Sequence, residues 1–194
     1  MNKAKFNLIK SKYGHYVSWA IWAEEGERPK DNIGDLSIFD IERNNQILDL
    51  LRPNIILVGL NISRRIETPL GNFHDSRSKS TDYKLRDVLK DTVLWGGYMT
   101  DIIKDFEEKS SGNMMKYLRT DKKFEEENLE IFRKELKILE IDTPLIIAIG
   151  NDAYKILKRN FKDEFKIFKI PHYASYLSKK DYREKVQLML EDLY

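Results

Sequence analysis

The stretch Asn54-Ile55-Ile56-Leu57-Val58-Gly59-Leu60-Asn61 decides the fold expected for this chain. Its four consecutive apolar residues, three of them β-branched, end at a glycine, which is typical of a strand buried on both faces of a sheet. Leu145-Ile146-Ile147-Ala148-Ile149-Gly150 repeats the pattern. Strands of this kind belong to parallel sheets whose two faces are covered by helices. The sequence therefore predicts an α/β protein.

Further strands and helices are expected around these two strands. Gly97–Ile102 and Phe165–Ile170 are predicted as two more strands. Apolar residues at helical spacing predict helices from Ser37 to just before Pro53, over Tyr83–Lys90, Phe124–Leu139 and Ala153–Arg159, and after Ser178 with a stripe that ends at Leu193. Asp82, Asn151 or Asp152, and Ser178 are expected to cap three of these helices. Together they predict one three-layer αβα domain over residues 1–194, with a short, mainly parallel, four-stranded sheet.

Two segments lack a clear period. Residues 1–35 include the aromatic run Tyr13–Trp22 and the loop-like stretch Glu24–Asp35, so they are expected to form an aromatic-rich extension packed on the domain. Residues 104–122 are charged and are interrupted at Ser110–Asn113.

Composition excludes several classes of protein. The 194 residues hold no cysteine, which rules out disulfides, a thiol nucleophile and thiolate zinc sites. There is no apolar run near the roughly 18 residues of a membrane span, and no leader-like start, so a cytoplasmic protein is expected. Three isolated histidines and the lack of a phosphate-binding glycine fingerprint predict neither a metal nor a cofactor.

The charges nearly balance, with 34 Lys and Arg against 32 Asp and Glu. Proteins that grip nucleic acid through their bulk charge are more basic, with a pI above about 9. This chain has a pI of about 8.5. Any contact with nucleic acid should therefore come from a local patch.

Ligands of parallel sheets bind beyond the carboxyl ends of the strands. Polar residues that follow the predicted strands are the site candidates: Asn61, Ser63, Asp101, Asn151, His172, Tyr173 and Ser175. The Asn61 amide could orient a water or a ligand, although it could also simply serve a strand exit. His172 suits proton transfer near neutral pH, although a loop histidine can also just bind a backbone carbonyl.

The polar loop 62–81 is long enough to be functional. Phe73 within it could stack on a base or could plug the loop onto the core. Nearby cations could form the local patch that phosphate contact requires: Arg64, Arg65, Arg77 and Lys79. The run Glu125–Glu127 reads as a solvated helix start that should face away from nucleic acid.

In their order along the chain, these motifs resemble the uracil-DNA glycosylase superfamily, most closely its mismatch-specific uracil/thymine branch. The similar segments span Asn54 to Leu193: Ile55–Ser63, Gly71-Asn72-Phe73, Asp82–Leu89, Gly97–Lys104, Leu145–Leu157 and Pro171–Ser175. Two motifs depart from the family pattern. Ile62-Ser63 stand where the family has Pro-Gly, and the last motif reads Pro-His-Tyr in place of His-Pro-Ser.

The resemblance implies a monomeric, metal-free enzyme that hydrolyses the N-glycosidic bond of a uracil, mismatched or modified base flipped out of DNA. Asn61 would position the attacking water, Phe73 would stack on the base, and His172 would hold the base or the strand. Gly59 and Leu60 would join the substrate-binding residues. Two alternatives stay open: a catalytically inactive module that binds a nucleotide, nucleic acid or protein partner, and an α/β hydrolase or transferase of small nucleosides.

Overall fold

A computed structural model describes residues 1–191 and contains one five-stranded sheet in the order β1-β3-β2-β4-β5. Its strands are β1 Ser18–Trp19, β2 Arg52–Gly59, β3 Gly97–Asp101, β4 Leu145–Ile149 and β5 Lys166–Ile170. Strands β2 to β5 run parallel, and β1 pairs antiparallel with β3. The α/β class and the mainly parallel sheet are confirmed. The strand count of four is wrong, because the two-residue β1 is too short to leave a pattern in the sequence.

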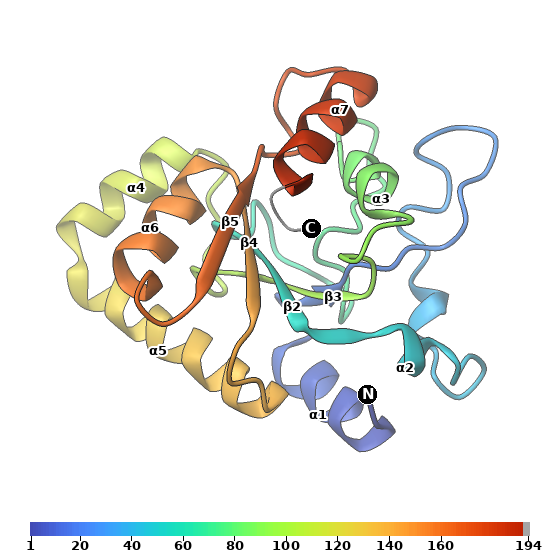
Figure 1. Ribbon diagram of the computed structural model, residues 1–194, viewed down its shortest axis with the longest axis horizontal. Helices are drawn as coiled ribbons and strands as arrows, with labels where there is room; N and C mark the ends of the chain where they lie inside the picture. Colours follow the sequence, from blue (N-terminus) through green and yellow to red (C-terminus); the bar gives the residue numbers. More distant parts are fainter. Residues whose placement is uncertain (192–194) are drawn as a thin grey trace.

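Helices cover both faces of the sheet, as Figure 1 shows. They are α1 Lys3–Tyr13, the 3₁₀ helix η1 Leu36–Phe39, α2 Ile47–Leu50, α3 Tyr83–Leu89, α4 Ser111–Thr120, α5 Lys122–Leu139, α6 Asn151–Phe161 and α7 Lys179–Leu190. One face carries α1, α4, α5 and α6, and the other carries α3 and α7. Three layers result, as expected. Leu193 lies outside the described residues.

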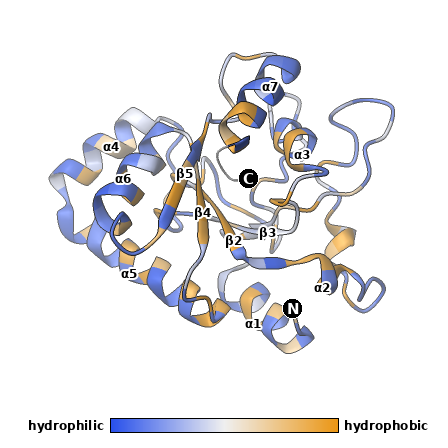
Figure 2. Ribbon diagram, in the orientation of Figure 1, coloured by the Kyte–Doolittle hydropathy of each residue, from blue (hydrophilic) through white to orange (hydrophobic). Residues whose placement is uncertain are grey.

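The core follows from the alternation of side chains along the strands. In β2, Ile56 and Val58 point into the apolar cluster beneath α1, α5 and α6, whereas Ile55 and Leu57 point into the cluster beneath α3 and α7. This is why the strand reads as an unbroken apolar run. Figure 2 shows the hydrophobic strands at the centre and hydrophilic residues on the helices around them.

The N-terminal segment supplies part of the domain. Asn2 caps α1 by accepting a hydrogen bond from the Lys5 N–H, and Phe6 and Ile9 bury one face of the helix. Strand β1 then extends the sheet beyond β3. Residues 1–35 thus contribute a helix and an edge strand, and they share the core of the rest of the chain.

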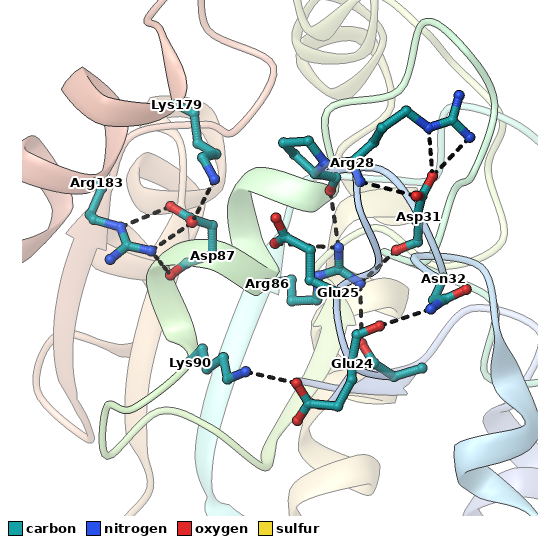
Figure 3. Close-up of polar contacts among 12 residues, drawn as sticks. Glu24, Glu25, Arg28, Asp31, Asn32, Arg86, Asp87, Lys90, Lys179 and Arg183 are labelled. Carbon is teal, nitrogen blue, oxygen red and sulfur yellow. Dashed lines mark hydrogen bonds and ion pairs between the residues drawn. The ribbon is translucent and has the colours of Figure 1, made fainter.

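The loop between β1 and η1 is held by one arginine, drawn in Figure 3. Arg86 of α3 is 2% exposed, and its guanidinium donates to the carbonyls of Ala23, Pro29 and Asp31 at 3.1, 3.0 and 2.8 Å. Backbone carbonyls in such a loop have no N–H partners from a neighbouring strand. The N–H groups of the buried guanidinium take the place of those partners.

The helix predicted from Ser37 to Pro53 is wrong. The structure has η1, a series of turns and the single turn α2 instead. Local side chains compete for the backbone: Asp35 accepts from the Ser37 N–H, Asp40 accepts from the Glu42 N–H, and Asn44 donates to the Ile38 carbonyl. Such bonds favour turns over a continuous helix.

The break expected at Ser110–Asn113 is the start of α4. The Ser110 hydroxyl accepts from the Asn113 N–H, which caps that helix. Ser178 caps α7 as expected. The cap expected at Asn151 or Asp152 is wrong, because Gly150 holds the N-cap position of α6 without a side-chain bond. None of the helices within residues 1–191 is long and apolar enough to cross a membrane.

Candidate functional site

A cavity of about 770 Å³ opens at the carboxyl edge of the sheet. Strands β2 and β3 end side by side there, with Gly59 paired to Asp101, and β4 and β5 end beside them. The segments that follow all four strands line the cavity, together with the 72–82 part of the long loop. It is the position at which open parallel sheets bind their ligands.

The structure brings most of the predicted residues to this cavity. Its lining includes Gly59, Leu60, Asn61, Ser63, Phe73, Arg77, Lys79, Asp101, Asn151, His172 and Tyr173. Three predicted residues do not line it: Arg64, Arg65 and Ser175. Ser175 lies just behind the cavity, where its N–H donates to the His172 carbonyl and its own carbonyl accepts from the Lys84 ammonium at 3.1 Å.

Asn61 is held in one orientation. Its side-chain nitrogen Nδ2 donates to the carbonyls of Ile62, Phe106 and Glu108 at 2.8, 3.1 and 2.8 Å. Three acceptors around one end of the amide identify that end as the nitrogen. The oxygen Oδ1 accepts no hydrogen bond from any residue in 1–191, so it is available to a water or a ligand.

Asp101 lies at the end of β3 and is 3% exposed. Asn72 donates to Asp101 Oδ2 at 2.8 Å and to the Tyr16 carbonyl at 2.7 Å, which ties the loop to the sheet. Burial raises the pKa of Asp101 to about 7, against the opposing effects of the Asn72 bond and the Lys104 charge. The carboxyl therefore changes charge near neutral pH.

Gly59 is required beside this carboxyl. A Cβ at position 59 would clash with Asp101 Oδ1 and would lie 3.3 Å from the Phe73 ring. The glycine thus lets the ends of β2 and β3 and the Phe73 ring meet at one point.

Phe73 forms a wall of the cavity and is otherwise packed against the core. Its backbone is left-handed, with φ of 63°, a conformation that costs a non-glycine residue on the order of 1 kcal/mol. The Phe73 N–H donates to Asn72 Oδ1 and its carbonyl accepts from the Trp22 indole. The Phe73 ring therefore combines the two roles expected for an aromatic on this loop, a wall of the cavity and a plug on the core.

His172 faces the same cavity from the loop after β5. Its Nδ1 accepts from the Ala174 N–H at 3.1 Å, so the neutral ring carries its proton on Nε2. The ring stacks on Tyr173 with centroids 4.4 Å apart. Although residue 172 is exposed to the cavity, the surrounding protein atoms lower its pKa by desolvation, which favours the neutral form.

The entrance of α6 lies against His172. Gly150 has φ of +92°, a conformation that glycine adopts readily, and a Cβ there would lie 3.3 Å from the His172 Cβ. Asn151 follows as the first residue of α6, and its Oδ1 accepts from the Lys169 ammonium at 3.0 Å. The Gly150 turn therefore leaves room for the histidine.

The cations expected on the 62–81 loop are partly neutralised. Arg64 and Arg77 both pair with Asp75, at 3.4 and 2.8 Å. Lys79 forms no ion pair with any residue that the structure describes. The local basic patch on this loop is weaker than the count of its cations suggests.

The expectation that Glu125–Glu127 are all solvated is wrong for Glu125. Its side chain is buried beneath α6, where it pairs with Arg159. The positive guanidinium compensates the buried carboxylate. One residue of this acidic run is therefore buried, although the sequence pattern predicts a solvated run.

Sequence reasoning missed three groups around the cavity. Asn72 is buried and bridges the loop to Asp101. Asp82 holds the N-cap position of α3 as predicted, but its side chain makes no capping bond. It accepts from the Asp75 N–H and the Ser80 hydroxyl, and burial raises its pKa to about 6. Behind Asp101, Lys104 and Glu135 form a fully buried ion pair at 2.8 Å. The only signal for Asn72 was its place beside Phe73.

No group of three or more potential metal ligands is assembled among residues 1–191. No protein-family model matches the chain, and no curated protein matches its sequence.

Proposed function

We propose that this protein binds a flipped nucleotide of DNA and hydrolyses its N-glycosidic bond. The observation that carries the proposal is the fixed Asn61 amide, whose Oδ1 is free in the cavity that Phe73, Asp101 and His172 also line. An amide oxygen held in this way can orient a water. An aromatic wall, a carboxyl and a histidine donor suit a planar base with polar edges.

The proposed reaction depends mainly on how the water and the base are positioned. As the C1′–N bond breaks, both of its electrons go to the base, the water oxygen bonds to C1′, and the proton that the water loses ends on the base. The sugar becomes cationic in this transition state, so a weak nucleophile suffices when it is held correctly. Asn61 would hold the water, and the Nε2–H of His172 would donate to the departing base.

Asp101 would contact the edge of the base. Above a pH of about 7 its carboxylate accepts N–H groups of the base, and below that pH the protonated carboxyl can also donate. DNA as the partner, a monomeric state and a cytoplasmic location belong to the same proposal.

An assay of base release tests this proposal. The purified protein is incubated with duplexes that carry uracil, mismatched or modified bases, and alkali then cleaves any abasic strand. We expect cleavage of at least one duplex by the wild type, and loss of cleavage in Asn61→Ala. Asn160→Ala is the matched control, because that amide donates only to the Ile156 carbonyl on α6, away from the cavity.

A second candidate is a binding module without catalysis. Ile62, which replaces the family's proline, is 3% exposed, and its carbonyl accepts from both Asn61 and Glu108. Asp75 also neutralises two cations of the adjoining loop. Tight binding of a nucleotide or DNA without base release from any substrate would favour this function.

A further inference from the structure

A second cavity, of about 380 Å³, lies between α4, α5 and α6. Asp152 lines both this cavity and the one at the sheet edge, and Ser111 of the first adjoins Gly112 of the second. The two cavities are therefore neighbours on one surface. No motif in the sequence pointed to the second one.

Four cations gather in this second cavity from three helices. Arg119 comes from α4, Lys122 from α5, and Lys155 and Arg159 from successive turns of α6. Only two carboxylates line it, Glu125 and Asp152, so the formal charge is 4 − 2 = +2. The fold thus concentrates positive charge that is dispersed along the chain.

The cavity has a fixed floor. Glu125 is 4% exposed and accepts from Arg159 Nε at 3.1 Å and from its Nη2. Lys122 lies 3.8 Å from the same carboxylate, and Lys155 lies 3.2 Å from Asp152. These pairs orient three cations, whereas Arg119 pairs with no carboxylate among residues 1–191. The positive charge left over is available to an anion.

We propose that this second cavity binds the phosphate backbone of the DNA strand whose flipped base occupies the first cavity. The proposal rests on the proposed function for the identity of the strand. Phosphates favour sites with several Lys and Arg side chains, and a strand that passes Asp152 would reach these cations directly from the first cavity. On the 62–81 loop, Asp75 pairs with both Arg64 and Arg77.

Binding of DNA with a charge-matched pair of variants tests this assignment. The probe is a short fluorescein-labelled duplex with a stable abasic-site analogue, followed by fluorescence anisotropy over a range of salt concentrations. The variant is Arg119→Ala/Lys122→Ala. The control is Lys134→Ala/Lys137→Ala, which removes two exposed cations farther along α5 that form no ion pair with residues 1–191. Circular dichroism checks that both variants fold.

We expect Arg119→Ala/Lys122→Ala to bind about tenfold or more weakly, with a salt dependence shallower by roughly one to two ions released, and the control to bind like the wild type. Equal affinities of both variants and the wild type would overturn the inference and leave the proposed function standing. Weakened binding of the variant, with no base released by the wild type, would support the inference and count against the proposed function. A wild type that binds no DNA would also overturn the inference.

Discussion

Single residues set the shape of the cavity, and Gly59 is the clearest case. Its missing side chain gives space to Asp101 Oδ1, while Asn72 holds the other oxygen of that carboxyl. We expect Gly59→Ala to lower the free energy of unfolding by about 1–3 kcal/mol, because a buried group must move. Gly112→Ala is the control, since a Cβ there has only Ser110 Oγ nearby, at 3.6 Å. Chemical denaturation measures the free energy of unfolding of both variants. A Gly59→Ala variant as stable as the wild type would contradict the steric role of Gly59.

The Asp101 carboxyl gives the site a dependence on pH. Its pKa of about 7 in the folded protein lies above the value of about 4 in the unfolded chain. The native state therefore binds this proton more tightly, and the group's contribution to stability is complete below pH 4 and lost as pH rises to about 7. Asp101→Asn has no such proton.

We expect the stability of Asp101→Asn relative to the wild type to increase by roughly 3–4 kcal/mol between pH 4 and pH 8. The difference between the two proteins is the quantity to measure, because Asp82 is present in both. Its pKa is raised to about 6, so its contribution to the free energy of unfolding also falls as pH rises. Urea denaturation at a series of pH values provides it. Parallel stability curves for the two proteins would contradict the assigned pKa.

At the scale of elements, a buried ion pair joins the end of β3 to α5. Lys104 and Glu135 are 3% and 0% exposed at their side chains, and Thr100 donates to Glu135 and accepts from Lys104. Removal of one partner leaves an uncompensated charge in the core. The pair thus fixes the strand end that carries Asp101.

We expect Lys104→Met to lower the free energy of unfolding by about 3–5 kcal/mol, and Lys104→Met/Glu135→Leu to lower it by much less than the sum of the two single changes. Lys180→Ala/Glu184→Ala, at an exposed pair on α7, should leave stability nearly unchanged. Thermal and chemical unfolding measure the cycle. Additive effects would show that the two buried charges do not stabilise one another.

The elements also show what sequence patterns can predict. The strands β2 and β4 are unbroken apolar runs because both of their faces are covered. Helix α5 has an apolar stripe because only one of its faces is buried. Helix α1 was missed although Phe6, Ile9 and Tyr13 have helical spacing, because the aromatic run that follows obscured it. The turns at 40–46 were missed because side-chain bonds to the backbone leave no period.

The gathering of the candidate residues around one cavity was predictable to the same extent as the sheet. Residues next to strand ends, such as Asn61 and His172, line the same cavity because parallel strands end at one edge. Partners that depend on tertiary folding were out of reach. Asn72 lies 29 residues from Asp101 in sequence, and Arg159 lies 34 residues from Glu125, with no local pattern to link them.

At the scale of the whole molecule, Tyr176 is a fully exposed tyrosine. Tyr176 belongs to the loop whose earlier residues His172 and Tyr173 line that cavity. Large side chains on nucleic-acid enzymes can insert between bases and fill the gap that a flipped base leaves. Under the proposed function, the exposed Tyr176 ring is suited to this role.

We expect Tyr176→Ala to slow base release from a duplex by about tenfold or more and to leave release from single-stranded DNA nearly unchanged, since only the duplex must be opened. Leu188→Ala, at an exposed apolar residue of α7, is the control. Single-turnover rates on both substrates measure the effect. An equal loss on single and double strands would place Tyr176 in substrate binding instead.

The central claim is that Asn61 holds the water that cleaves an N-glycosidic bond. The most direct measurement is the free base released from modified duplexes, quantified by mass spectrometry for the wild type, Asn61→Ala and Asn160→Ala at equal folded concentrations. The account predicts release by the wild type and Asn160→Ala, and a loss of about a hundredfold or more in Asn61→Ala. Release by Asn61→Ala at the wild-type rate, or no release by any of the three proteins, would contradict it.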